Sequence, residues 1–106
     1  MSISELHKTT NEKEVERVKK MGGMIFQNRL AGNLLVTRAL GDFGMQEYGL
    51  ISQPYICRLK LLQNSVLVLA SDGIWDVVTN DILKELFSKQ KNFSVSNFAK
   101  DIVEYA

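Results

Sequence analysis

The stretch VLVLASDGIWDVV, residues 66–78, constrains the fold most strongly. It opens with five apolar residues, carries no charge before Asp72, and then supplies Gly73 and a second acid, Asp76. A short, uniformly apolar run is typical of a strand that is covered on both faces. We therefore predict a central strand over 66–71 that ends at Asp72-Gly73. A carboxylate in that position is held on a rigid support where it can meet a ligand.

Asp72 and Asp76 are candidate metal ligands. They are four residues apart, so they share one side if a helical turn begins there. Carboxylate oxygens suit a hard divalent cation. An ordinary Asp-Gly turn, with Asp76 capping or solvating the next helix, is the alternative, and the residues alone favour it. A P-loop nucleotide hydrolase is disfavoured, because the chain has no G-x-x-x-x-G-K-[ST] segment.

The N-terminal half predicts a helix, a hairpin and a loop. Asn11 followed by Glu14 resembles a capping box, and Gly22-Gly23 supplies a stop. Two runs that favour strands flank Gly32-Asn33, residues that tolerate a hairpin turn. The glycine-rich segment 41–54 lacks periodicity and predicts a long loop.

The C-terminal half predicts two more strands and two helices. The strands meet at Gln63-Asn64, and Thr79 caps a helix with one apolar face, formed by Ile82, Leu83, Leu86 and Phe87. Ser94 caps the last helix, with Phe93 and Phe98 spaced as a hydrophobic staple. This order of elements indicates an α+β fold with antiparallel strands and flanking helices, in one domain or part of one.

Four other residues receive structural interpretations. His7 lies near the N-terminus with no nucleophile in a recognisable motif, which favours a solvated side chain over a catalytic one. Cys57, the single cysteine, is expected to be a buried structural thiol. Trp75 is expected to pack in the core. Arg38 is expected to form a structural ion pair, with Asp42 as the candidate partner, and binding to an outside partner is the alternative.

The composition argues against several classes of partner. Lys and Arg number 13 and Asp and Glu number 12, so neither nucleic acid nor a membrane surface is an expected partner. No apolar run approaches the roughly 20 residues that span a bilayer, and the first residues lack the pattern of a secretory signal. We expect an intracellular protein, cytoplasmic or nuclear. A core this small folds alone only if its elements pack well.

Three segments resemble signatures of one enzyme family. GNLLVTRALGDF (32–43) resembles G-x-L-x-[VL]-[ST]-R-A-L-G-D-F, LVLASDGIWDVV (67–78) resembles LILACDGIWDV, and HKTTNEKEVERVKKMGGMI (7–25) resembles DHKPxxxxExxRIxxxGGxV. These are signatures of the metal-dependent type 2C serine/threonine protein phosphatases, and their order and spacing also match. The resemblance implies that residues 1–106 are a central-to-C-terminal fragment of a single phosphatase-like domain.

The resemblance also implies a fold, a cofactor and site residues. The fold would be part of a four-layer α-β-β-α sandwich with two antiparallel sheets. Asp72 would bind one of the core manganese or magnesium ions, and Asp76 would join it at an additional, weaker site. Such a centre activates a water that attacks phosphoserine or phosphothreonine. Arg38 and Asp42 match the signature, and no residue of this chain is assigned as catalytic.

Several family segments have no counterpart in this sequence. The chain contains neither D-G-H-G-G nor G-S-x-D-N, and it has Glu5-Leu6-His7-Lys8 where the family has D-H-K. Two acids cannot fill a site in which each ion takes about six oxygen ligands, so we expect this chain to be inactive alone. The alternative is a non-catalytic pseudophosphatase adaptor that binds a kinase or signalling partner. We also expect self-association, as a domain-swapped homodimer that covers missing strand edges.

Overall fold

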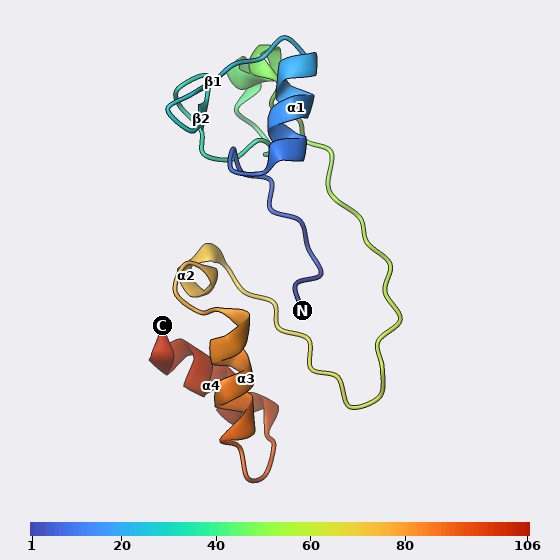
Figure 1. Ribbon diagram of the computed structural model, residues 1–106, viewed down its shortest axis with the longest axis vertical. Coiled ribbons are helices and arrows are strands. Elements are labelled where there is room, and N and C mark those ends of the chain that lie inside the picture. The colour runs from blue at the N-terminus through green and yellow to red at the C-terminus, as the bar shows by residue number, and fades with distance from the viewer. The chain divides into compact units, whose positions relative to one another are not determined.

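The computed structural model describes all residues, 1–106, and divides them into two compact units. One unit is Ile3–Arg58, and the other comprises Leu59–Ala106 with Met1–Ser2. Helices and one antiparallel two-stranded sheet make up the regular structure (Figure 1), which gives the chain α+β character. None of the helices combines the length and the apolar character needed to cross a membrane. The four-layer sandwich stays a prediction.

The predicted first helix is confirmed as α1, Glu12–Lys20. Asn11 is its N-cap, and the side chain of Asn11 accepts a hydrogen bond from a backbone amide of the first turn. After the helix, Gly22 takes a positive φ of 80°, and the amide of Gly23 donates to the carbonyl of Val18 at 2.9 Å. This is the Schellman arrangement that glycine favours at helix ends.

The hairpin forms earlier than predicted. Strands β1, Ile25–Phe26, and β2, Arg29–Leu30, pair in antiparallel fashion. Gln27 and Asn28 turn the chain with φ of 50° and 57°, which is the left-handed pair of a type I′ turn. Placing the hairpin turn at Gly32-Asn33 was wrong, because glutamine at the first turn position gives no turn signal. Gly32 instead contributes a positive φ to a second turn directly after β2.

Segment 41–54 contains a helix where only a loop was predicted. The 3-10 helix η1, Phe43–Tyr48, lies within it. The adjoining core of this unit consists of Val18, Leu30 and Leu50, all nearly inaccessible to solvent. Four half-buried apolar residues pack against that core: Ile25, Leu34, Ala39 and Met45.

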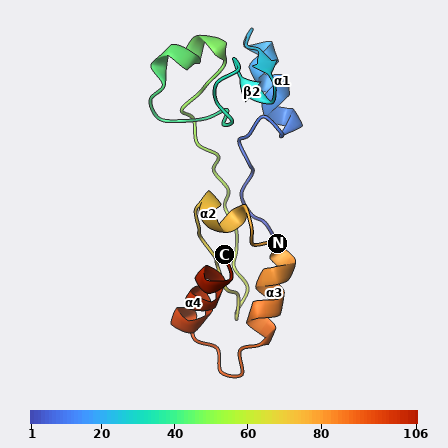
Figure 2. The ribbon, with the colours of Figure 1, turned by 90° about the vertical axis from the view of Figure 1, so that its left-hand side faces the viewer.

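The other unit is built from helices. After the single turn α2, Asp72–Trp75, come α3, Asn80–Ser88, and α4, Val95–Tyr105. The caps predicted at Thr79 and Ser94 are confirmed, since each side chain accepts a backbone amide of its helix. Helices α3 and α4 pack against each other (Figure 2), and their core contains the buried residues Val78, Phe98 and Ile102. The staple also forms, with the rings of Phe93 and Phe98 5.8 Å apart.

The two strands predicted over 55–71 do not form. The chain turns at Gln63-Asn64 as predicted, with φ of 62° at Asn64, but neither flanking segment enters a sheet. The prediction of a covered central strand was wrong, because Leu67 and Leu69 remain 49% and 83% exposed. A strand is stable only when a neighbouring strand takes up its backbone hydrogen bonds, and the only sheet of the chain contains β1 and β2.

The buried carboxylate of Glu14 connects α1 to the segment that follows the hairpin. Glu14 is only 4% exposed. Its Oε1 accepts from Arg38 Nη2 at 2.6 Å, and its Oε2 accepts from Arg38 Nε at 3.1 Å. Arg17 Nη2 and the hydroxyl of Thr37 donate to the same Oε2 at 3.1 and 2.7 Å. Glu14 therefore neutralises two arginines instead of reaching back to Asn11 in the predicted capping box.

Both arginines also hold backbone carbonyls. Arg17 Nη1 donates to the carbonyl of Gly49 at 2.9 Å, and its Nη2 donates to that of Thr37 at 3.0 Å. Arg38 Nη1 donates to the carbonyl of Gln53 at 3.1 Å. The hydrogen bonds from Arg38 are the largest cause that lowers the pKa of Glu14, and those from Arg17 and Thr37 add to it. Together they outweigh burial, which raises the pKa, and bring it to about 2.

We predict that Glu14→Gln destabilises the unit Ile3–Arg58 by about 2–4 kcal/mol, because it leaves two partly buried arginines without their counter-charge. The free energy of opening is measured from amide hydrogen exchange of α1, since the only tryptophan, Trp75, lies in the other unit. Glu16→Gln on the same helix is the control. The exposed Glu16 pairs only with Lys20, so no measurable change is expected. Equal effects of the two variants would contradict the assigned role of Glu14.

The same carboxylate predicts acid sensitivity. The pKa of Glu14 is lowered from 4.5 to about 2 by folding, so its contribution is complete above pH 4.5 and is lost as the pH falls toward 2. The loss amounts to about 3 kcal/mol over this interval. Hydrogen exchange at a series of pH values should show the stability gap between wild type and Glu14→Gln closing as Glu14 becomes protonated. A gap that stays constant would show that another group controls the acid response.

Gly23 allows a close approach between the end of α1 and η1. A Cβ atom at this position would lie 2.0 Å from the carbonyl oxygen of Tyr48, so the two segments must separate if a side chain is added. We predict that Gly23→Ala destabilises the unit by more than 1 kcal/mol, as overpacking against backbone does. Gly44→Ala is the control, because its Cβ would meet nothing within 4 Å. Hydrogen exchange in α1 should distinguish the two; faster exchange in both would argue against a local clash.

Candidate functional site

The two candidate ligands lie at opposite ends of one helical turn. Asp72 is the first residue of α2, and Asp76 is its C-cap. The amide of Asp76 donates to the carbonyl of Asp72 at 2.8 Å, and both residues are exposed. The helical turn that would place Asp72 and Asp76 on one side is therefore present. Their role as metal ligands stays a prediction.

Residues around α2 fix the turn in place. The chain enters it extended, with φ of −77° and ψ of 174° at Ser71. The indole Nε1 of Trp75 donates to the carbonyl of Ala70 at 2.8 Å, and Ile74 packs against the helical core. Trp75 is 41% exposed, so its prediction as a core residue was wrong. It closes the turn through its N–H group.

The two carboxylates of this turn, Asp72 and Asp76, are the type of ligand that manganese or magnesium prefers. They are too few to complete the coordination of either ion. Carboxylate oxygens are the hard ligands that these ions prefer, but each ion takes about six of them. Nowhere in the chain do three or more histidine, cysteine or acidic side chains gather closely enough to hold a metal ion. Two exposed carboxylates do not complete a centre, and no reaction step follows from them alone.

Arg38 is a structural residue in this chain. The structural ion pair is confirmed, but the partner suggested for it was wrong, since Arg38 pairs with Glu14 instead of Asp42. All three guanidinium nitrogens donate to Glu14 or to the carbonyl of Gln53, so three of its five N–H groups serve the fold. Asp42 precedes η1 in the left-handed region, with φ of 48°.

The sequence interpretation missed Glu14. Its signal was present, because Glu14 lies four residues before Val18 and therefore on the same helix face. An acid on that face needs a buried cation, and Arg17 and Arg38 both lie in the segments that carry the family resemblance. Hydrogen bonds among Glu14, Arg17 and Arg38 bring segments 7–25 and 32–43 together.

Cys57 and His7 differ from their expected surroundings. Cys57 is exposed, because no strand covers its segment, so the prediction of a buried thiol was wrong. The ring of His7 packs edge-on against Tyr55 at 6.1 Å, and its buried Nε2 has no hydrogen-bond partner. The solvated histidine expected from the sequence is therefore half-buried. Tyr55 adjoins both residues, because its side chain also shares a hydrogen bond with Cys57.

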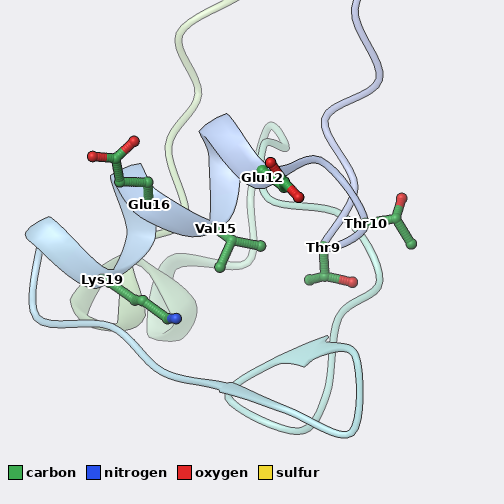
Figure 3. Close-up of a pocket in the computed structure, with 6 residues that line it drawn as sticks. All are labelled: Thr9, Thr10, Glu12, Val15, Glu16 and Lys19. Atoms are coloured by element: carbon green, nitrogen blue, oxygen red, sulfur yellow. The ribbon is translucent and has the colours of Figure 1, made fainter.

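A shallow pocket follows the outer side of α1 (Figure 3). It is lined by Thr9, Thr10, Glu12, Val15, Glu16 and Lys19. Thr9 donates its hydroxyl to the carbonyl of Asn28, and Glu16 pairs with Lys20 at 2.8 Å. The pocket contains neither histidine nor cysteine, and the Thr9 hydroxyl and the Glu16 carboxylate are engaged in these contacts.

Comparison with known proteins identifies the origin of the resemblance. The sequence model of the family described as Protein phosphatase 2C matches residues 1–106. Protein phosphatase 2C homolog 1 of Saccharomyces cerevisiae is 34% identical over 102 residues, which cover 94% of this chain and 35% of that protein. The protein of the same name in Schizosaccharomyces pombe is 35% identical, with 94% and 28% covered.

A mammalian relative shows the same relationship. Protein phosphatase 1B of Bos taurus is 34% identical over 97 residues, which cover 83% of this chain and 20% of that protein. The chain thus spans between 20% and 35% of the length of these three curated relatives. The match extends over every segment on which the resemblance rested. The chain belongs to the protein phosphatase 2C family.

Proposed function

We propose that this chain is part of a metal-dependent phosphatase domain that hydrolyses phosphoserine and phosphothreonine in proteins. Membership of the protein phosphatase 2C family over residues 1–106 carries the proposal. The structure supports it at one point, since Asp72 lies exposed at the start of α2 directly after an extended segment. A phosphoprotein is then the substrate partner.

Asp72 would hold a manganese or magnesium ion, and Asp76 would contribute at an additional, weaker site. When bound in a complete centre, such ions supply an activated water and polarise the phosphoryl group. The residues of this chain would hold the Asp72 carboxylate in position. The indole N–H of Trp75 and the packing of Ile74 fix the turn, and the carboxylate of Asp72 is presented from it.

The incomplete donor set favours two further conclusions. This chain alone is expected to be inactive, because no third ligand gathers near the two acids. The second candidate function is that of a pseudophosphatase adaptor, in which the same fold binds a kinase or signalling partner without catalysis. Exposed carboxylates that lack a complete ligand set suit that function as well.

Manganese titration of this chain by calorimetry tests the ligand assignment. We predict weak binding that Asp72→Asn reduces at least tenfold and Asp76→Asn reduces less, because each variant removes a charged oxygen ligand. Asp81→Asn is the control. Asp81 is an equally exposed acid on α3 that pairs with Lys84 at 2.8 Å, so its loss should leave binding unchanged.

Hydrolysis of a phosphothreonine peptide in the presence of manganese separates the remaining possibilities. We expect no turnover by the chain alone. Turnover that disappears with Asp72→Asn would show that the chain assembles a working centre and would contradict the expected inactivity. Binding that is equally weak in wild type and Asp72→Asn would overturn the ligand assignment and favour the adaptor.

A further inference from the structure

The sulfur of Met21 accepts a hydrogen bond from a buried arginine of the Glu14 network. Met21 is the C-cap of α1, and its Sδ atom lies 3.3 Å from Arg17 Nη1, one helical turn earlier on the same face. Among the four methionines of the chain, it is the one whose sulfur has such a donor. A thioether sulfur is only a weak acceptor. A strong cationic donor thus points at an atom that binds it weakly.

The same guanidinium also donates to three oxygen acceptors. Arg17 Nη1 donates to the carbonyl of Gly49 at 2.9 Å. Its Nη2 donates to the carbonyl of Thr37 at 3.0 Å and to Glu14 Oε2 at 3.1 Å. Each terminal nitrogen of an arginine carries two N–H groups, so the sulfur and the carbonyl of Gly49 can each take one from Nη1. Met21 therefore does not compete with the contacts that connect α1 to the rest of its unit.

The side chain of Met21 is accessible to solvent. It is 50% exposed and lies outside the buried cluster around Val18. Lys19 and Lys20 before it and Gly22 after it are exposed as well. Lysine side chains are rarely buried, so a whole phosphatase domain would also leave this end of α1 in contact with water. A small oxidant can therefore reach the sulfur.

We propose that Met21 is an oxidation site for hydrogen peroxide, and that its sulfoxide binds Arg17 more strongly than the thioether does. In this reaction the sulfur gives an electron pair to one peroxide oxygen. An S–O bond forms, the O–O bond breaks, and the leaving hydroxide takes up the proton of the transferred oxygen as water. The sulfur is oxidised by two electrons to the sulfoxide, and the peroxide is reduced.

The position of Met21 determines the direction of the effect. Oxidation of methionine usually damages a protein because it places a polar group in an apolar core, but Met21 lies outside that core. The sulfoxide oxygen instead meets the N–H group of Arg17 that already points at the sulfur. A hydrogen bond from a charged donor is stronger than one between neutral groups. Oxidation should therefore hold Arg17 more firmly and stabilise the attachment of α1 to Gly49 and Thr37.

Treatment of the chain with dilute hydrogen peroxide, followed by amide hydrogen exchange, tests the proposal. Peptide mass spectrometry shows which methionines have gained an oxygen atom. We expect exchange in α1 to slow by about fivefold when Met21 is oxidised, as one additional hydrogen bond would produce. Exchange that is unchanged or faster after oxidation of Met21 would overturn the proposal. A Met21 that stays unmodified while the exposed Met24 is oxidised would overturn it as well.

Three variants make the result specific to Met21. M21L removes the sulfur and keeps a similar apolar volume, so peroxide should no longer slow exchange in α1. M24L removes a sulfur from a side chain that is 61% exposed, and it should respond as the wild type does. M21Q supplies an amide oxygen as a permanent acceptor for Arg17 and should show the slower exchange without peroxide. A response that persists in M21L, a response lost in M24L, or an M21Q that exchanges as fast as the untreated wild type would each contradict the proposal.

Discussion

The buried carboxylate of Glu14 is the constraint on which the unit Ile3–Arg58 depends. It accepts hydrogen bonds from Arg17, Thr37 and Arg38, and the two arginines in turn hold three backbone carbonyls. Removing such charges from water costs free energy, so the network adds little stability over an apolar core of the same size. Removing one partner is strongly destabilising, because it leaves the remaining charges buried and unpaired. The network therefore specifies which segments meet, more than it adds stability. The small apolar core around Val18 could not do this alone.

This network changes the meaning of the family signatures. Arg38 lies within segment 32–43, which resembles a phosphatase signature, and an arginine in such a segment is a natural candidate for binding phosphate. Three of its guanidinium N–H groups donate to Glu14 and Gln53, so its substitution would also damage the fold. Asp72, in the second signature segment, is exposed at the start of α2. A signature of this family thus contains residues that hold the fold as well as candidate ligands, and the contacts of each residue distinguish the two.

The sequence predicted features whose causes are local. Asn11, Thr79 and Ser94 begin helices where expected, because a cap and a helix face are set by residues within a few positions. The helical turn that carries Asp72 was stated only as the condition for Asp72 and Asp76 to share a side, and the structure contains it. The two strands predicted over 55–71 are absent from the structure. A strand forms only where a partner strand pairs with it, and local composition does not determine that pairing. Glu14 was missed because its partners Thr37 and Arg38 are more than twenty residues away.

Segment 65–71, which enters no sheet, and the candidate ligand Asp72 are consecutive in the chain. Ser71 ends the unpaired segment with extended backbone, and Asp72 begins α2 directly after it. Any strand that pairs with residues 65–71 therefore fixes the backbone that leads into the acid. A carboxylate on a fixed support loses less conformational freedom when it binds an ion. If Asp72 holds an ion as proposed, pairing of segment 65–71 with a strand and binding of that ion should favour each other, because both depend on the ordering of the same few residues.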